Sequence, residues 1–464
     1  MNVLLINSTW PYLESKYYKI NVYTPEISTV WPPIGIGYIA SCLEENGHRV
    51  AIFDRNAEIA KLGNYESVNK KMVQMLEAFQ ADIVGISATT PTAEDAFLCS
   101  RIIKEIDPSV IVVLGGAHAT ALPEKILNKN KSIDIVCIGE GEETTVELCS
   151  GIALNQIRGI AFRNTDGEIT ITEKRTPIKN IDKIPYPARH LFDMDFYLQP
   201  STQVIFGYKC SATSIVSSRG CPNSCAFCAG PAMSQNKVRF HSVDYTINEI
   251  EMLINDYNVN GLFFTDEMFT GNRNRVLELC EQMVSRQMQS KIVWGAQLRV
   301  DYIDSQLLSA MKRAGCVQVE YGFESGSPRI LKEMNKNITV EQCIAASRMT
   351  KEAGLRQLAN IIVGWPTEGL DDLLLTIKLV EETDPDFVSW HEFKPLPGSE
   401  GWKYAELYNM EENSFEKNEP FLFTTVSAEE KKEMIRVYNR CLEKQRGKTN
   451  TSSGLYSETS DSNK

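Results

Sequence analysis

Three cysteines lie close together in the sequence, with three residues between Cys221 and Cys225 and two between Cys225 and Cys228. A Val- and Ile-rich run ending near Ser217 precedes them and predicts a strand, and the Gly, Pro and Asn beside them are typical of a loop. Three thiolates on one loop can bind three irons of a cubane cluster. Because no fourth cysteine follows at short range, one iron would stay open to a cofactor or a substrate.

A zinc site or a disulfide is the alternative for these cysteines. A structural zinc site needs four ligands, and neither Cys nor His occurs in the twelve residues after Cys228. The sequence therefore favours an iron–sulfur cluster.

The Cys-x3-Cys-x2-Cys spacing, with Phe227 directly before the last cysteine, resembles the signature of the radical S-adenosylmethionine (SAM) family. The resemblance implies a [4Fe–4S] cluster whose open iron is chelated by the amino and carboxylate groups of SAM. Cys221, Cys225 and Cys228 would be the metal ligands and catalytic cysteines, and Phe227 would belong to the SAM site.

Length and composition indicate the class of protein. The chain has 464 residues, which favours two or three domains, and its 43% hydrophobic and 23% charged content is typical of soluble globular proteins. A net charge of −12 argues against nonspecific nucleic-acid binding. Positions 1–7 open into a strand-like run rather than a signal peptide, and no apolar run is long enough to span a membrane. We therefore expect a cytoplasmic protein whose twelve cysteines are thiols or metal ligands rather than disulfides.

Strand and helix patterns alternate through the second half of the chain. Helical segments separate six expected strands, at 214–217, 262–265, 292–296, 317–322, 358–363 and 387–390. About six βα units predict a partial (β/α)6 barrel, in which chemistry takes place on the loops after the carboxyl ends of the strands. The cysteine loop follows the first of these strands.

Polar residues follow the other barrel strands and suit the groups of SAM. The resemblance assigns acidic side chains to its amino group and ribose, a guanidinium to its carboxylate and a backbone turn to its adenine. The residues are Asp266 and Glu267 for the amino group, Arg299 for the carboxylate, Glu324 and Ser325 for the ribose, and Gly364 within 362–365 for the adenine. Each alone has the alternative of a solvated loop charge or a helix N-cap.

The N-terminal third shows the same alternation. Expected strands at 3–6, 49–53, 83–87, 110–114 and 133–138 alternate with helices, which predicts a Rossmann-like, doubly wound parallel sheet. Ligands of such sheets bind beyond the carboxyl ends of the strands. Three loops at those ends, 87–91, 115–120 and 139–142, are rich in small and polar residues.

These loops together resemble the cobalamin-binding domain found upstream of many radical SAM domains. The resemblance implies that they wrap the nucleotide tail of cobalamin, through Ser87, Thr89, Gly115, Gly116, His118, Thr120, Gly139, Glu140 and Gly141. Many cobalamin enzymes carry Asp-x-His-x-x-Gly after the first strand, but 7–12 here read Asn-Ser-Thr-Trp-Pro-Tyr. The lower cobalt ligand is therefore absent, water or a residue from elsewhere. A Rossmann-like domain that binds nothing is the alternative.

The remaining segments complete the expected organisation. We place the cobalamin-binding domain at 1–155, a linker with a small strand pair at 156–205, the barrel at 206–398, a short α-helical C-terminal region at 399–446 and a disordered tail at 447–464. The fold class is therefore α/β in both large domains.

The resemblance as a whole is to cobalamin-dependent, class B radical SAM methyltransferases. It implies that one SAM methylates cobalt and that a second yields a 5′-deoxyadenosyl radical, which activates an unactivated substrate carbon for methylation. The implied partners are a small-molecule or peptide substrate and an electron donor such as flavodoxin or ferredoxin, with no nucleic acid.

Three alternatives stay open. The first is a cobalamin-linked radical cyclase, oxidase or rearrangement enzyme, including an anaerobic tetrapyrrole cyclase, without methyl transfer. The second keeps the radical chemistry beside an empty N-terminal domain. The third is a non-catalytic metal-binding interaction protein.

Overall fold

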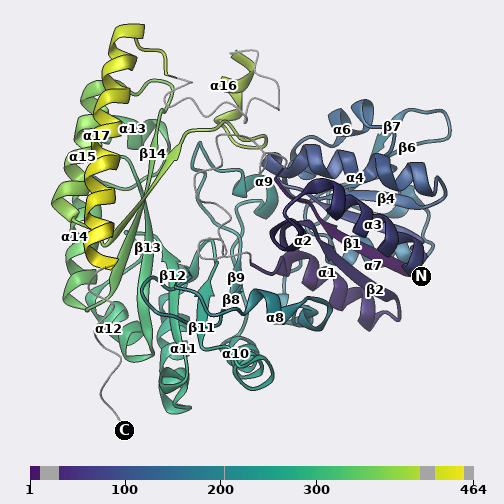
Figure 1. Cartoon of the computed structure of the whole chain (residues 1–464), viewed down its shortest axis with the longest axis horizontal. Helices are drawn as coiled ribbons and strands as arrows, with labels where there is room; N and C mark the ends of the chain where they lie inside the picture. The colour runs from purple at the N-terminus through teal and green to yellow at the C-terminus, as the bar shows by residue number, and fades with distance from the viewer. Residues whose placement is uncertain (11–30, 203, 408–423, 454–464) are drawn as a thin grey trace.

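Two α/β units lie side by side in the computed structural model, which describes residues 1–10, 31–202, 204–407 and 424–453 (Figure 1). The N-terminal unit is purple to blue in Figure 1, and the C-terminal unit is teal to yellow. Within the described residues, every helix is too short or too polar to cross a membrane.

The N-terminal unit is built on a seven-stranded sheet in the order β2-β1-β3-β4-β5-β6-β7. The first five strands in this order are parallel, and β6 and β7 are antiparallel. The strands are β1 (Asn2–Asn7), β2 (Arg49–Asp54), β3 (Ile83–Ser87), β4 (Ile111–Gly115), β5 (Ile135–Cys137), β6 (Ile160–Arg163) and β7 (Ile169–Ile171). The structure confirms the predicted doubly wound α/β fold.

Helices cover both faces of this sheet, because its central strands are apolar on both sides. One face packs against α1 (Ile34–Glu45) and α7 (Glu142–Cys149). The other packs against α2 (Arg55–Leu62), α3 (Tyr65–Phe79), α4 (Ala93–Ile106) and α6 (Pro123–Lys129). The short α5 (Ala117–Ala121) follows β4 directly.

The N-terminal sheet continues beyond the expected boundary at 155. The strand pair predicted for the linker is present as β6 and β7, but β6 pairs with β5 and extends the N-terminal sheet. Burial explains the pairing, because Ile160, Ala161 and Phe162 are removed from solvent in it. The rest of the linker packs beside the same unit through α8 (Met194–Tyr197), where the Tyr197 hydroxyl donates to the Asp54 carboxylate at 2.5 Å.

The C-terminal unit is an open barrel of six parallel strands in the order β15-β14-β13-β12-β11-β8, as predicted. They are β8 (Ala212–Ile215), β11 (Gly261–Phe264), β12 (Val293–Leu298), β13 (Cys316–Glu324), β14 (Arg356–Val363) and β15 (Phe387–Glu392). The first strand ends before Ser217, since the backbone N–H of Ser217 donates to the Asp266 carboxylate rather than to a neighbouring strand.

Helices line the outside of the barrel and share one apolar core with it. They are α10 (Val243–Tyr257), α11 (Arg273–Ser285), α12 (Ser305–Arg313), α13 (Pro328–Glu333), α14 (Val340–Glu352) and α15 (Leu370–Thr383). Side-chain caps fix several starts; the Ser242 hydroxyl, for example, accepts from the Tyr245 N–H at the start of α10. A small hairpin, β9 (Ser218–Arg219) and β10 (Arg239–Phe240), with α9 (Gly230–Ser234), lies at the end of β8.

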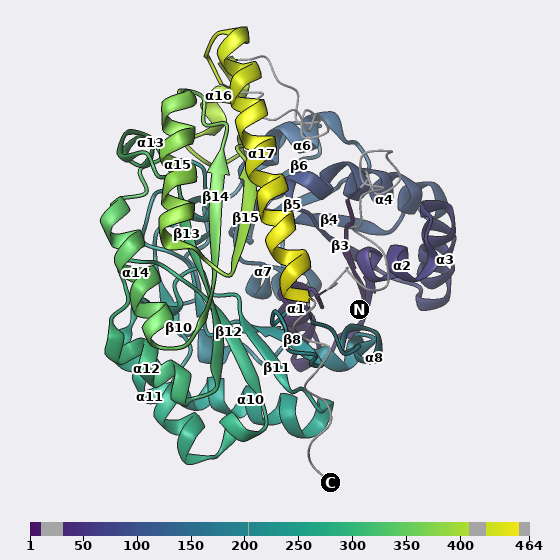
Figure 2. The ribbon, with the colours of Figure 1, turned by 60° about the vertical axis from the view of Figure 1, so that its left-hand side comes forward.

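The C-terminal region is helical, as expected, but its long helix continues beyond the predicted end at 446. The short α16 (Trp402–Leu407) is followed by α17 (Ala428–Ser453), which packs against α15 beside the barrel (Figure 2). A single glycine at 447 costs a helix only about 1 kcal/mol and does not end it. Residues 454–464 of the expected tail lie outside the described residues.

Candidate active site

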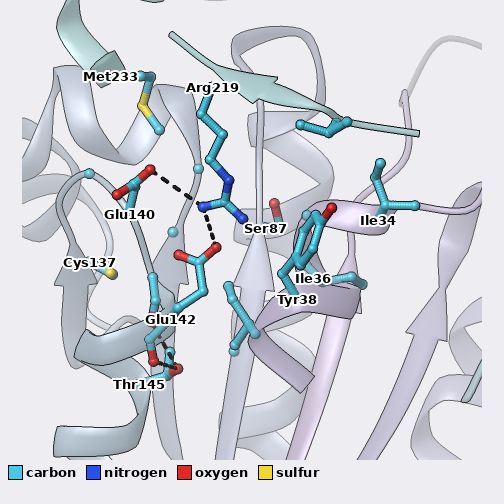
Figure 3. A pocket seen from close by; sticks show the side chains of 18 of the residues that line it. Ile34, Ile36, Tyr38, Ser87, Cys137, Glu140, Glu142, Thr145, Arg219 and Met233 are labelled. Carbon is cyan, nitrogen blue, oxygen red and sulfur yellow. Dashed lines mark hydrogen bonds and ion pairs between the residues drawn. The ribbon is translucent and has the colours of Figure 1, made fainter. Parts of the chain in front are cut away.

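A cavity of about 380 Å³ lies between the two units, at the carboxyl ends of strands from both sheets (Figure 3). Its inner part lies between the N-terminal sheet and the helices α1 and α7, where it is lined by Leu5, Gly85, Val113, Cys137, Ile36, Ile39 and Thr145. Its outer part is lined by barrel residues, including Ser218, Gly220 and Glu267. Gly220 directly precedes Cys221, so the cavity adjoins the cysteine loop.

Most of the loop residues predicted for the N-terminal unit line this cavity. They are Ser87, Gly115, Gly116, Gly139, Glu140 and Gly141. Thr89, His118 and Thr120 lie outside the lining and have contacts within the loops. Thr120 accepts from the Gly139 N–H at 3.0 Å, and the buried His118 places Nδ1 3.2 Å from the Thr90 hydroxyl. These two side chains therefore support the loops.

The loop after β1 carries no histidine in its described part, Asn7–Trp10, and residues 11 and 12 lie outside the described residues. The Ser8 hydroxyl donates to the Ser87 carbonyl at 2.7 Å, which joins this loop to the end of β3. The described part of this loop therefore offers no imidazole as a metal ligand.

Two glycines at the end of β4 have different roles. Gly116 has φ +97°, and a Cβ there would collide with the backbone of Ala88, so only glycine lets the β3 and β4 loops approach this closely. A Cβ on Gly115 would meet only Cys137, at 3.8 Å. Gly115 therefore leaves space that the cavity uses.

An ion-pair cluster joins the two units at the cavity. We call Glu140, Glu142, Arg219 and Arg239 the interdomain cluster. Arg219 lies 2.6 Å from Glu142 and 3.4 Å from Glu140 (Figure 3). Arg239 lies 2.8 Å from Glu140. The Arg219 guanidinium also stacks over the ring of Tyr38, 4.8 Å from its centroid.

The electrostatics of this cluster favour the charged forms. Burial alone would raise the pKa of Glu140, but the hydrogen bond from Arg239 and the charge of Arg219 hold it below its usual range. Burial would likewise lower the pKa of Arg219, but Glu142 and Glu140 raise it overall. The cluster therefore holds the β9–β10 hairpin, whose connecting segment carries the three cysteines, against the N-terminal loops.

Arg239→Ala tests this role. We expect it to lower the free energy of unfolding by about 2–4 kcal/mol, because it leaves a buried carboxylate poorly paired. Arg158→Ala is the matched control, since Arg158 and Glu173 pair with side chains 59% and 73% exposed; we expect a loss below about 1 kcal/mol. Urea unfolding followed by tryptophan fluorescence measures both. Equal losses would contradict a special role for the cluster.

The three cysteines lie on the loop after β9. Cys225 is buried, and Cys221 and Cys228 are half-buried. The Gly230 N–H donates to the sulfur of Cys228, and the Asn223 amide to that of Cys221, both at 3.3 Å. Burial raises the pKa of Cys225, whereas the positive charges of Lys336 and Arg299 lower it.

The geometry of the cysteine loop does not suit a single metal ion. In the part of the chain that the structure describes, no three His, Cys, Asp or Glu side chains converge on one ion position. A cubane carries its irons at separate corners and needs its thiolates further apart than one ion does. The donor set of three thiols therefore fits a cluster better than zinc.

The acidic pair after β11 divides into two roles. Asp266 is buried and accepts from the N–H and the hydroxyl of Ser217, at 2.9 and 3.2 Å. Burial raises its pKa to about 6. Asp266 therefore fixes the end of β8, whereas its neighbour Glu267 lines the cavity and accepts from the Gly220 N–H.

Glu324 and Lys336 form a buried ion pair at the carboxyl end of β13. The Lys336 ammonium is 2.7 Å from the Glu324 carboxylate, and a Cβ on Gly322 would collide with both groups. Arg299 pairs with Asp301 at 3.0 Å, donates to the Lys336 carbonyl at 3.0 Å and lies 4.0 Å from the Cys225 sulfur. The structure thus brings Glu324, Arg299 and the cysteine loop together.

Sequence reasoning missed Lys336. The signal that could have found it is the Asn335-Lys336-Asn337 triplet, because asparagines favour tight turns with positive φ. Both asparagines have positive φ here, 50° and 56°. The turn directs the lysine back towards Glu324.

The remaining residues predicted for the SAM site pack or hydrogen-bond within the barrel unit. Ser325 is fully buried, and its hydroxyl lies 3.2 Å from that of Thr376. Gly364 has φ +82°, and its N–H donates to the Glu368 carboxylate at 2.5 Å. Phe227 packs on the small apolar cluster that includes Trp365, with the Lys336 ammonium 5.7 Å from its ring centroid.

Comparisons with known proteins agree with this geometry. Two family models match, the B12 binding domain over residues 20–149 and the Radical SAM superfamily over residues 215–380. The chain is 34% identical over 414 residues to an uncharacterized methyltransferase of Pyrococcus horikoshii, covering 88% of this chain and 85% of that one. It is 28% identical over 403 residues to the anaerobic magnesium-protoporphyrin IX monomethyl ester cyclase of Rubrivivax gelatinosus, covering 84% and 70%.

A solved structure has a similar fold. The radical S-adenosylmethionine methyltransferase TsrM of Kitasatospora setae, solved with cobalamin and a [4Fe-4S] cluster, superposes with a TM-score of 0.68. The match covers 88% of this chain and 75% of that chain at 16% identity. At this identity the likeness is one of fold.

Proposed function

Because the chain belongs to the radical SAM family with an N-terminal B12-binding domain, we propose that it is a cobalamin-dependent methyltransferase that acts on an unactivated carbon of its substrate. One observation carries the proposal. The cavity at the strand ends of the B12-binding unit is shared with the barrel, where it reaches the residue that precedes Cys221. A group bound there therefore lies beside the cysteine loop.

The residues around the cavity fit cobalamin. The glycine backbone at Gly115 leaves space in the inner part of the cavity, and the walls of the cavity are mostly apolar. Such walls suit the benzimidazole end of the nucleotide tail. We assign the inner part to that tail and the outer part, beside the interdomain cluster, to the corrin side.

The residues of the cysteine loop fit a cluster with SAM bound to it. Cys221, Cys225 and Cys228 would hold the cluster, and Arg299 beside Cys225 offsets part of the negative charge that three thiolates bring. Glu324 suits the ribose hydroxyls. We move the carboxylate of SAM from Arg299, the residue expected from the sequence, to Lys336, because Arg299 is paired with Asp301. When bound, the cluster and SAM supply reductive carbon–sulfur cleavage, and cobalamin supplies a transferable methyl group.

The chain's own residues position these groups and separate them from water. The interdomain cluster fixes the spacing between the cavity and the cysteine loop. Asp266 and Ser217 hold the end of the strand from which that loop starts. Phe227 and Trp365, on one apolar cluster, exclude water from the side of the loop.

Product analysis tests methyl transfer. The full chain is reconstituted anaerobically with iron, sulfide and cobalamin, reduced with titanium(III) citrate, and given trideuteromethyl-SAM with a metabolite extract of the host cells. We expect S-adenosylhomocysteine and 5′-deoxyadenosine together with a metabolite that has gained the labelled methyl group. Deoxyadenosine without S-adenosylhomocysteine, from enzyme that retains cobalamin, would reject methyl transfer.

Deoxyadenosine formation without S-adenosylhomocysteine would favour a second candidate function, that of a radical cyclase or oxidase without methyl transfer. The 28% identity to the anaerobic cyclase of Rubrivivax gelatinosus, over 84% of this chain, supports it. The 34% identity to the uncharacterized methyltransferase of Pyrococcus horikoshii favours methyl transfer. A substrate that loses hydrogen without gaining the label would identify the second function.

Lys336→Met tests the SAM site. We expect the Kd for SAM to rise by about 10- to 100-fold, because the variant loses a charge-assisted hydrogen bond worth about 1.5–3 kcal/mol. Equilibrium dialysis of reconstituted enzyme measures it. Lys332→Met is the control, since Lys332 is an exposed lysine on α13. Unchanged SAM affinity in a variant with full iron content would contradict the assignment.

A further inference from the structure

The inner face of the barrel carries a set of polar side chains that the proposed cofactor sites do not use. Tyr321 faces outward, since its hydroxyl lies 2.9 Å from that of Thr350 on α14, so Glu320 and Gly322 face the interior. Strand register places Gln297 beside Glu320, and Asn360 beside Gly322 and Ser389. We call Gln297, Glu320, Asn360, Ser389 and His391 the polar cup.

The cup is open to solvent and has hydrogen-bonding groups on adjacent strands. Gln297 and His391 are exposed although both lie within the sheet. His391 Nε2 lies 3.2 Å from the Asn360 side-chain oxygen and 3.0 Å from the Ser389 hydroxyl. These side chains are therefore accessible to a polar molecule from solvent.

The cup has a floor and a rim. At the floor, the Phe206 N–H donates to the Gln318 side chain at 2.9 Å, the Phe206 ring packs on Phe387, and Arg356 donates to the Phe206 carbonyl. At the rim, the pair of Glu324 and Lys336 lies over Gly322. The cup is therefore directly below the residues that we assign to SAM.

Glu320 is the carboxyl group of the cup, and the described residues supply no counter-ion for it. It accepts from the Gln318 amide at 3.1 Å, and it forms no ion pair with any residue that the structure describes. Burial raises its pKa to about 7, against hydrogen bonds from Gln318 and Gln297. The nearby cations are engaged elsewhere, Lys336 by Glu324 and Arg356 by the floor.

We propose that the polar cup is the substrate subsite and that it binds a small polar molecule through a protonated amine seated on Glu320. This inference rests on the proposed function, because it places the substrate of that reaction. An ammonium group supplies the counter-ion that the described residues do not, and its three donors suit the amide oxygens of Gln297 and Asn360.

Other classes of substrate fit the cup poorly. A carboxylate or phosphate would face Glu320 and be repelled by it. An apolar lipid would remove the carboxyl, both amides and the imidazole from water without replacing their hydrogen bonds. A site built for hydrogen bonding rejects such an analogue by about 10⁴-fold or more.

The first experiment uses the holoenzyme and simple probes. Saturation-transfer NMR of the reconstituted full chain with SAM compares n-butylamine, butyrate and butanol. We expect transfer to butylamine above the other two, lost in Glu320→Gln and kept in Glu278→Gln, an exposed control on α11. Equal transfer to all three probes in the unmodified enzyme overturns the inference whether or not the variant folds.

The second experiment separates this inference from the proposed function. In the labelled-methyl assay, we expect labelled products to react with dansyl chloride, and Glu320→Gln to lower their yield by about 100-fold or more. Iron and cobalamin content stay unchanged in that variant. No labelled product from the unmodified enzyme rejects the proposed function, whereas labelled products without an amine, or unaffected by Glu320→Gln, reject only the subsite.

Discussion

Cys225→Ala abolishes SAM cleavage and leaves cobalamin binding intact. We expect about four irons per chain in the reconstituted enzyme and almost none in the variant. Deoxyadenosine formation falls below about one thousandth of the original rate, since the cofactor supplies the chemistry. Cobalamin stays bound because Cys225 does not line the cavity between the units. Metal analysis, absorbance spectra and product chromatography measure the three quantities.

A control variant separates loss of the cluster from loss of the fold. Cys42 is half-buried on α1. Its pKa is raised to about 12, mainly by burial and also by the negative charge of Glu142, so its thiol is unreactive. Cys42→Ala keeps iron and SAM cleavage. Zinc in place of iron in the unmodified protein, or full iron content in Cys225→Ala, would end the cluster assignment.

The family and both folds were predictable from the sequence because their signals are local. The cysteine spacing is read within eight residues, and apolar strands alternate with helices in both units. The comparisons confirm the predicted family, and the structure confirms the predicted sheets. The glycines at strand ends were equally predictable, because Gly116 and Gly139 have positive φ, a backbone conformation that favours glycine.

Individual side-chain roles were harder to predict because partners come from distant parts of the chain. Asp266 and Ser325 have the right types and positions for SAM, yet both are occupied by buried hydrogen bonds, with Ser217 and with Thr376. His118 and Thr120 sit in the right loop but support it from within. Sequence order alone does not distinguish a side chain that faces the cavity from one that holds the loop.

The interdomain cluster and Lys336 were missed for the same reason. Glu140 was predicted as a cavity residue, but its pairing with Arg219 and Arg239 joins segments that are 79 and 99 residues apart. Such pairs become visible only when the two units are placed together. Their residue types alone are those of ordinary surface charges.

Gly115→Phe blocks cobalamin binding without disturbing the cluster. Gly115 lines the cavity at the end of β4, and its φ is not in the positive region. A side chain there points into space, since a Cβ would meet only Cys137, at 3.8 Å. A phenyl ring would occupy the space that we assign to the nucleotide tail. We expect cobalamin affinity to fall by at least about 100-fold, because filling such a pocket forces out the bound group.

Gly115→Ala is the matched control, because one methyl group fits and should change cobalamin affinity by only a few-fold. Cobalamin absorbance after anaerobic desalting measures retention. Iron content and deoxyadenosine formation stay unchanged in both variants, whereas S-adenosylhomocysteine and methylated product are lost in Gly115→Phe. Full cobalamin retention by Gly115→Phe would show that the vitamin binds elsewhere, while loss of iron together with cobalamin would point to misfolding, as we expect for the strained Gly116→Ala.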